Sequence, residues 1–539
     1  MSIEKYVKNI CINAKTASKQ ISCIDENAKN LILESLISEL DKNRERIISA
    51  NNIDVERFKN SENFANSFLD RLLINNDRID SIIESIKEIL DTIKCNKFIL
   101  ISTIDVYDNI NGELNEDSNI LGNNHIYGRN RYLFEEYIKK KFNNYHIIRL
   151  PGLFGKGLKK NIIYDLINNN NVNDINSNSE FQWYYLNWLK EDIDKIINND
   201  IKICNLFTPP LSSKIIINIY NSVFNNKYLI NEKDFYCYNT KTKYGELFGG
   251  GEYIRNLNDV KDGLFDYFNF EKLDKSKLCV SNICLNNIYH LQFSYILKLN
   301  GIKNVQIAPT KLIKSWDKLK EIDFDVFEKN NIKVYSFQSI TYTLNNLNIF
   351  DKSTQEDLMK HLKNVIDFAE EKGVKVLVFG CPRNKKILDM EADNSRIFID
   401  FFKKIGDYME GKDIVICIEN NSNKYNCNFL NTIDECAELV SKINKNNVKM
   451  MVDVGNAIME NDSWYYLKKN INIIYNIDVA HPFMKDFSEL HESNEIFNFV
   501  LKNNHYKKII NLEMLIKNKE NELDLLYKSL DNFIKTYSN

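Results

Sequence analysis

The most constraining feature of this sequence is the segment 414–421, an apolar run rich in β-branched residues that ends on Glu419 and two amides. A continuous apolar run of this length predicts a strand that is buried on both faces, as in a parallel sheet. A buried strand has no structural reason to end on a carboxylate unless that group meets a cation or a reacting group. Glu419 is therefore a candidate site residue.

The same pattern recurs three times after this segment. The strand-like runs 448–452, 473–477 and 509–512 end on Asp453, Asp478 and Glu513, with segments of helical length between them. Taken alone, each acid fits a helix cap or a solvated loop equally well. Four acids in phase favour a shared site over four separate caps.

Eight strand-like runs follow one another in the C-terminal part of the chain. They are 278–281, 305–308, 334–337, 376–379, 414–419, 448–453, 473–478 and 509–513. Amphipathic helical patterns such as 358–368 and 437–443 separate them. Eight alternating units over about 260 residues predict an α/β fold, a (β/α)8 TIM barrel over residues 276–539. Sites in that fold lie at the C-terminal strand ends, which is where the four acids fall.

The composition of the strand ends predicts a divalent metal site. Acids from strands five, six and eight can converge on one cation with a group from strand seven, either Asp478 or the nearby His481. Carboxylates with at most one imidazole suit Mn²⁺, Mg²⁺ or Co²⁺ better than a structural zinc ion. The predicted ligands are Glu419, Asp453, Asp478, His481 and Glu513.

Several motifs of the barrel segment resemble a known family. The segments 306–310, 379–384, 419–429, 452–455 and 512–514 resemble the xylose isomerase-like barrels of the sugar phosphate isomerase/epimerase group. The resemblance implies metal ligation by two Glu, one Asp and a strand-seven His. Matching on Pro482 places Asp478 at the strand-seven position, and Gln306 replaces the usual Glu of strand two.

This resemblance implies isomerisation or epimerisation of a sugar or sugar phosphate through an enediolate. Glu419 and Glu513 are expected to transfer the proton, and Asp453 to act as a ligand only. A family-two endonuclease barrel shares the fold but is disfavoured, because its trinuclear zinc site needs more His than this segment contains. A non-catalytic fusion of fragments stays an alternative.

Residues 95–275 contain a second set of groups suited to acid–base chemistry. A short strand ends near Thr103, and Tyr127 lies one helical turn before Arg131. With the strand and R-x-P motif at 147–155, this set resembles a truncated, Rossmann-like NAD-dependent epimerase/dehydratase, an extended short-chain dehydrogenase. The resemblance implies Thr103 as the hydroxyl, Tyr127 as the acid/base and Arg131 in place of Lys.

A nucleotide site is missing from the expected place upstream of this module. Residues 1–94 contain no Gly, and a Gly-rich turn is what lets the backbone approach a pyrophosphate. We therefore predict weak or absent NAD(P) binding. A sugar epimerase/dehydratase or reductase activity of this module stays the alternative function.

Residues 1–94 show helical periodicity throughout, without Gly or Pro. The segments 13–18, 50–55 and 69–72 resemble the N-terminal part of gamma-glutamyl phosphate reductase (glutamate-5-semialdehyde dehydrogenase). The nucleophilic Cys and dinucleotide-binding core of that family lie outside the resemblance. It implies a helical appendage suited to homo-oligomerisation, without reductase activity.

The overall composition excludes several classes of partner. A net charge of −3 gives no electrostatic basis for binding nucleic acid or an anionic membrane. No apolar run approaches the roughly 18 residues that span a bilayer, and the N-terminus lacks the layout of a signal peptide. Eleven Cys without CxxC spacing predict free thiols in the cytoplasm. The expected partner is a small-molecule sugar.

Overall fold

The computed structural model describes residues 26–59, 72–90, 97–108, 114–122, 125–228, 235–286, 288–491, 497–498, 501–502 and 506–538. The chain divides into two compact units. The first comprises Met1–Leu100 with Glu136–His146, and the second Ile101–Glu135 with Ile147–Asn539. Within the described ranges, none of the helices combines the length and the apolar character needed to cross a membrane.

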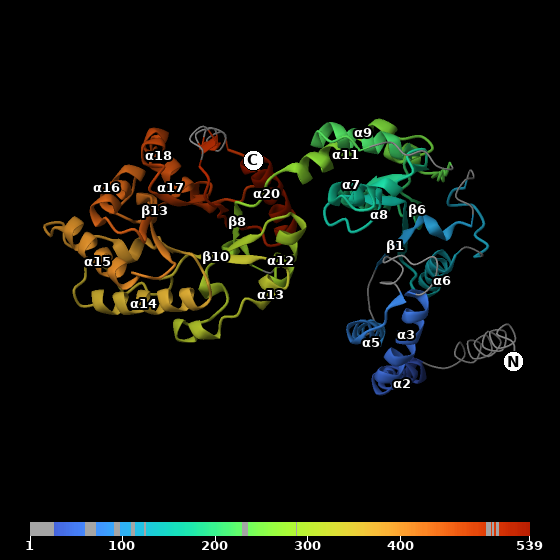
Figure 1. Ribbon diagram of the computed structural model, residues 1–539, viewed down its shortest axis with the longest axis horizontal. Coiled ribbons are helices and arrows are strands. Elements are labelled where there is room, and N and C mark those ends of the chain that lie inside the picture. Colours follow the sequence, from blue (N-terminus) through green and yellow to red (C-terminus); the bar gives the residue numbers. More distant parts are fainter. Residues whose placement is uncertain are drawn as a thin grey trace. The chain divides into compact units, whose positions relative to one another are not determined.

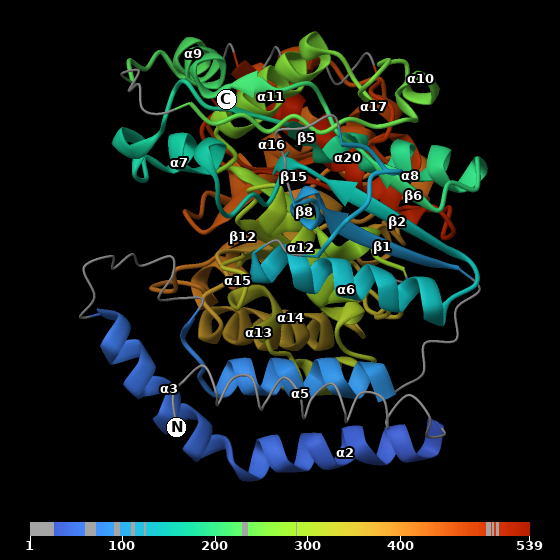
Figure 2. The same cartoon turned by 90° about the vertical axis from the view of Figure 1, so that its right-hand side faces the viewer.

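Helices dominate the first unit, as the sequence predicts. They are α2 (Glu26–Lys42), α3 (Arg44–Lys59) and α5 (Asn76–Leu90). Helices α2 and α5 pack against each other (Figure 2). The buried Asn51 amide donates to Leu72 O at 2.9 Å and accepts from Ile74 N at 2.7 Å, which fixes the chain entering α5. Segments 13–18 and 69–71, on which the resemblance to the reductase partly rests, lie outside the described residues.

Small sheets and short helices make up the region between the N-terminal helices and the barrel. A three-stranded sheet has the order β1-β2-β6, β3 pairs with β5 in parallel, and β4 pairs with β7 antiparallel. The strands are β1 (Phe98–Thr103), β2 (Tyr145–Leu150), β3 (Gly152–Phe154), β4 (Glu180–Phe181), β5 (Trp183–Tyr185), β6 (Ile203–Asn205) and β7 (Leu211–Ser212). The helices are α6 (Ile126–Lys141), α7 (Ile162–Asn168), α8 (Leu189–Asn198), α9 (Ser213–Phe224), α10 (Gly245–Phe248) and α11 (Leu257–Lys272).

The C-terminal region is a closed barrel of eight parallel strands (Figure 1). The strands are β8 (Leu278–Ser281), β9 (Asn304–Ile307), β10 (Lys333–Phe337), β11 (Val376–Phe379), β12 (Val415–Glu419), β13 (Val448–Asp453), β14 (Ile474–Val479) and β15 (Ile510–Leu512). All eight predicted strands are therefore confirmed. Two bounds need correction at the site: Asp478 lies one residue before the end of β14, and Glu513 lies one residue after the end of β15.

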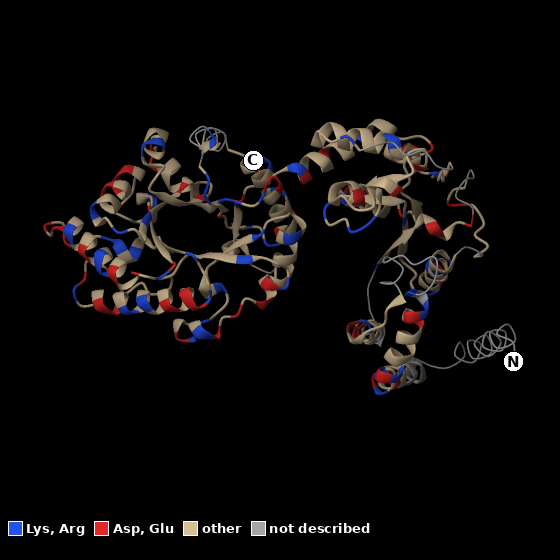
Figure 3. Cartoon of the chain, viewed as in Figure 1, with Lys and Arg blue, Asp and Glu red and all other residues tan. Residues whose placement is uncertain are grey.

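Helices surround the strands on the outside of the barrel (Figure 1). They are α12 (His290–Leu299), α13 (Asp325–Glu328), α14 (Gln355–Glu371), α15 (Asn394–Tyr408), α16 (Ile433–Ile443), α17 (Val454–Met459), α18 (Trp464–Asn470) and α20 (Glu522–Tyr537). Local sequence explains their ends. Helix α16, for example, begins with a capping box of Thr432 and Glu435 and ends on Asn444 in the left-handed conformation. Both basic and acidic residues occur along these outer helices (Figure 3).

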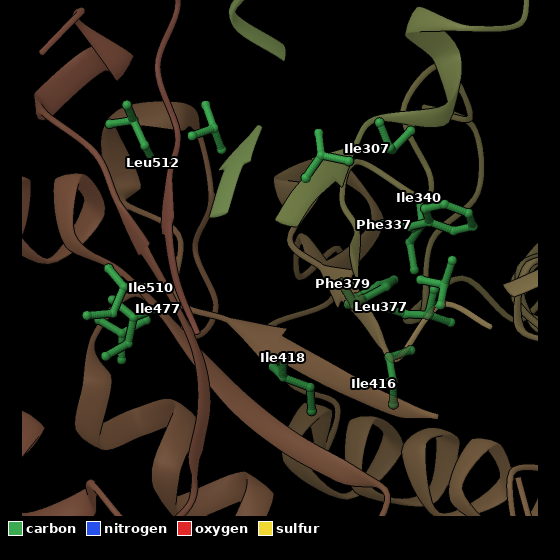
Figure 4. Packing of buried hydrophobic residues seen from close by; sticks show 14 of the residues in the cluster. Ile307, Phe337, Ile340, Leu377, Phe379, Ile416, Ile418, Ile477, Ile510 and Leu512 are labelled. Carbon is green, nitrogen blue, oxygen red and sulfur yellow. The ribbon is translucent and has the colours of Figure 1, made fainter. Parts of the chain in front are cut away.

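The strand residues alternate between two cores. One set packs against the helices; Figure 4 shows part of it, including Leu377, Phe379, Ile416 and Ile418. The residues between them point to the barrel interior, where Val376, Val378, Cys417 and Met451 form a separate cluster. Because strand side chains alternate with period two, Glu419 continues the inward series of Cys417, and Asp453 that of Met451.

Candidate active site

The structure brings the four predicted acids to one end of the barrel. Glu419 ends β12 and Asp453 ends β13, and Asp453 is the register partner of Asp478 in β14. The Glu513 N–H donates to the Val479 carbonyl at 3.0 Å, which places Glu513 at the level of the β14 end. In the ring of strands, Glu419 and Glu513 therefore flank the Asp453–Asp478 pair.

Burial raises the pKa of every acid in this cluster, and repulsion from neighbouring acids adds to the rise for Glu419, Asp478 and Glu513. Burial raises the pKa of Asp453 to about 6, although the Asn456 N–H donates to its carboxylate at 2.6 Å. Burial and then the charge of Asp453 raise the pKa of Asp478 to about 7. The same two causes raise the pKa of Glu419 well above its usual range, and burial and then Asp478 do so for Glu513. Such a cluster holds protons at neutral pH unless a cation compensates its charge.

Asp478, rather than His481, belongs to the carboxylate cluster. The Asp478 carboxylate accepts from Asn476 Nδ2 at 2.9 Å and Asn511 Nδ2 at 3.1 Å, in the interior of the barrel. The His481 ring instead stacks on Phe487 with 4.2 Å between centroids, and its Nδ1 lies 3.1 Å from the Asp486 carbonyl. The strand-seven position is thus a carboxylate among amides, and the imidazole makes contacts of its own.

Glu419 is held by residues that follow neighbouring strands. Its carboxylate occupies the space beside Gly380 that a side chain would fill, because a Cβ added at Gly380 would be 1.4 Å from Glu419 Oε2. Asn421 Nδ2 donates to Glu419 Oε1 at 3.0 Å. The fully buried Lys385, in the turn η7 (Pro382–Lys385) after β11, donates to the Glu419 backbone carbonyl, and its charge opposes the rise in the pKa of Glu419. The direction of this carboxylate is therefore set by a glycine and an amide.

The sequence alone assigned no role to three residues near the acids. Gly380 and Lys385 follow β11, and Tyr425 ends the turn η8 (Asn423–Tyr425) after β12. Burial and the charges of three of the four acids raise the pKa of Tyr425 to about 12, so its hydroxyl lies near the cluster. The signal available in the sequence is their place in the segments that follow predicted barrel strands.

The donor set fits a hard divalent cation, although the side chains do not surround one point. Within the described part of the chain, no three Asp, Glu, His or Cys side chains gather closely enough to hold a metal ion. Four carboxylates nevertheless supply the oxygen ligands that Mg²⁺ and Mn²⁺ prefer, and the burial that raises the pKa of Asp453 and of Asp478 disfavours their charged forms unless a cation is near. Metal binding stays a prediction.

Of the three predicted residues of the middle region, Thr103 caps a turn, whereas Tyr127 and Arg131 contact each other. Thr103 Oγ1 accepts from the Asp105 N–H at 3.2 Å and so caps the turn η1 (Ile104–Val106). Tyr127 is half exposed, and the Arg131 guanidinium lies 5.6 Å from the centroid of its ring. Among the described residues, no hydrogen bond joins Thr103 to Tyr127. Weak or absent NAD(P) binding stays a prediction.

The arginine of the R-x-P motif has a structural role in the same region. Arg149 is 1% exposed, and its Nη2 pairs with Glu135 Oε2 at 2.6 Å. The Arg149 Nη1 and the Asn205 amide donate to the Tyr107 hydroxyl, and Ser102 donates to Glu135. This network satisfies each of its charges internally, which suits a stabilising core rather than a reacting site.

Comparison with known proteins gives a family match within the barrel region. Residues 300–530 match the family described as Xylose isomerase-like TIM barrel. Similar solved structures include 3-keto-D-glucoside 4-epimerase from E. coli, with 14% identity, TM-score 0.41 and coverage of 49% of this chain and 100% of that one. D-Psicose 3-epimerase from Clostridium cellulolyticum H10 shows 12% identity, TM-score 0.41 and the same coverage. AP endonuclease, family 2, from Brucella melitensis shows 14% identity, TM-score 0.39 and coverage of 47% and 97%.

A separate short segment is similar to gamma-glutamyl phosphate reductases. The protein from Ruthia magnifica subsp. Calyptogena magnifica is 36% identical over 90 residues, which is 17% of this chain and 21% of the relative. That from Clostridium acetobutylicum is 39% identical over 88 residues, 16% of this chain and 20% of the relative. The chain spans about a fifth of the length of these relatives. Over residues 300–530, it is similar to the xylose isomerase-like TIM barrels.

Proposed function

We propose that the barrel isomerises or epimerises a sugar or sugar phosphate by proton transfer next to a carbonyl group. The observation that carries this proposal is the arrangement of Glu419 and Glu513 on either side of the Asp453–Asp478 pair. Two carboxyl groups with raised pKa values that flank one position suit removal and return of a proton. The match of residues 300–530 to xylose isomerase-like barrels supports the same class of reaction.

In this proposal each acid has a distinct task. One of Glu419 and Glu513 removes the proton from the carbon beside the substrate carbonyl, and the other returns it to the enediolate. Gly380 and Asn421 keep the Glu419 carboxylate directed at that position. Glu419, Asp453, Asp478 and Glu513 would hold a divalent cation, Mn²⁺, Mg²⁺ or Co²⁺, which supplies Lewis-acid polarisation of the carbonyl when bound.

Two variants separate proton transfer from metal binding. Glu513→Gln keeps the shape and one oxygen ligand but removes the base, so proton exchange should fall by roughly 10²–10⁴ with metal partly retained. Asp453→Ala should lose metal and exchange together, because it removes a ligand from a buried position. The assay measures metal content and incorporation of solvent deuterium into a panel of sugars.

Specific outcomes would contradict the proposal. Exchange at the wild-type rate in Glu513→Gln would show that Glu513 is not the base. A wild-type protein that binds no divalent cation and exchanges no proton would favour a non-catalytic barrel instead.

A further inference from the structure

Two buried glutamines, one in β9 and one directly after β10, differ in their hydrogen bonds: one amide is paired and the other is not within the described residues. Gln306 in β9 is 0% exposed, and its Oε1 accepts from Asn511 Nδ2 at 2.7 Å while its Nε2 lies 3.5 Å from the Asp478 carboxylate. Gln338, directly after β10, is 2% exposed. Across the part of the chain that the structure describes, neither Gln338 Nε2 nor Gln338 Oε1 has a hydrogen-bond partner.

The position of Gln338 connects it to the carboxylate cluster. Its backbone N–H donates to the Ile307 carbonyl at 2.9 Å, so the residue is fixed at the C-terminal edge of the barrel. The amide has a polar contact with Glu513 that lowers the pKa of that carboxyl. The geometry of this contact falls short of a hydrogen bond within the described residues. Gln338 therefore lies beside a predicted proton-transfer group, and among the described residues neither polar atom of its amide has a hydrogen-bond partner.

The loop that follows Gln338 has two further features that are common at ligand-binding sites. Ser339 and Thr343 have positive φ angles of 52° and 76°, an uncommon conformation and a strained one for a β-branched residue such as Thr343. Between them, the buried Thr341 hydroxyl also has no hydrogen-bond partner within the described ranges. Buried polar groups are usually paired, and backbone strain concentrates at ligand-binding sites.

We propose that Gln338 is a substrate-binding residue whose amide pairs with an α-hydroxy carbonyl group or with two neighbouring hydroxyl groups. The Nε2 group donates to one ligand oxygen, and Oε1 accepts from the adjacent hydroxyl. A ligand with an acceptor next to a donor gives both Gln338 Nε2 and Gln338 Oε1 a hydrogen-bond partner. A fully ionised phosphate has no donor for Gln338 Oε1. This assignment rests on the proposed function, because it places the reacting carbons of a sugar next to Glu513.

The test compares Gln338→Met with the matched variant Gln306→Met in the full-length protein. Met keeps the length of the side chain without its polar atoms. Without ligand, Gln338→Met should raise the unfolding temperature by about 2–4 °C, since it removes a buried unpaired amide. Gln306→Met should lower it, because Asn511 Nδ2 then loses the nearer of its two acceptors. Calorimetric unfolding measures both.

The second arm measures ligand binding with Mn²⁺ present and D-fructose or D-xylose as the probe. Gln338→Met should weaken binding by about tenfold or more, the effect of two lost hydrogen bonds. A Gln338→Met protein that is destabilised or unfolded would overturn the proposal, because the amide would then be structural. So would unchanged sugar affinity in that variant, or a wild-type protein that binds neither sugar. Binding through Gln338 without deuterium exchange would refute the proposed reaction alone.

Discussion

Gly380 offers the sharpest test of the carboxylate cluster, because a single methyl group must displace a predicted ligand. In Gly380→Ala the new Cβ would lie 1.4 Å from Glu419 Oε2, whereas real Cβ contacts essentially never fall below 3.0 Å. The oxygen must therefore move by at least 1.6 Å, the difference between these two distances. Metal–ligand distances tolerate only about ±0.2 Å, so a displacement of this size changes where Glu419 can present its oxygen to a bound cation.

We expect Gly380→Ala to weaken Mn²⁺ binding by roughly 10–100-fold, about 1.4–2.8 kcal/mol. The unfolding temperature should change little, since the atom that meets the new Cβ is the far end of the flexible Glu419 side chain. Isothermal titration with Mn²⁺ measures the affinity, and Cys381→Ala is the control, because it alters the next residue without adding a Cβ.

A rescue variant distinguishes this steric cause from general damage. Combining Gly380→Ala with Glu419→Asp shortens the carboxylate by one methylene and should recover part of the lost affinity. Wild-type affinity in Gly380→Ala, or no recovery in the double variant, would refute the reasoning that Gly380 positions a metal-binding Glu419.

Two further predictions follow from buried charges. The metal-free protein should lose stability as the pH rises from about 4 to about 7, because Asp453 and Asp478 bind protons more tightly in the folded state, with pKa values of about 6 and about 7. The slope is up to about 1.4 kcal/mol per pH unit for each group; denaturant unfolding at several pH values measures it, and an undiminished slope in Asp478→Asn would contradict the assignment. Glu135→Gln should destabilise the middle region by about 3–5 kcal/mol, since it leaves the charge of Arg149 buried without its partner. Urea unfolding tests this, and a loss below about 1 kcal/mol would count against it.

The barrel was predictable because its signals are local. Buried parallel strands are continuous apolar runs, so all eight could be located to within about a residue. Placement of the acids followed from the same rule, since parallel strands end at one edge. The bounds of β14 and β15 differ by one residue from prediction because strand ends depend on pairing with neighbours, which the sequence does not display.

The choice between Asp478 and His481 shows what required the tertiary structure. Both lie within four positions of each other in the sequence, so spacing cannot separate them. The fold distinguishes their surroundings, because the strand carries Asp478 into the interior beside Asn511, while the chain after β14 turns His481 onto Phe487. Which of the two binds a metal stays a prediction.

By itself, the sequence determined the α/β class, the eight-stranded barrel and the strand-end positions of Glu419, Asp453 and Glu513. Only the tertiary structure revealed that Gly380 makes room for a carboxylate and that, among the described residues, the buried Gln338 amide has no hydrogen-bond partner. The apolar periodicity of a strand is a property of consecutive residues, so the sequence displays it, and the order of the strands along the chain follows from it. Steric clashes and unpaired amides depend on contacts between side chains of different strands, often from distant parts of the chain. These contacts form only when the barrel closes.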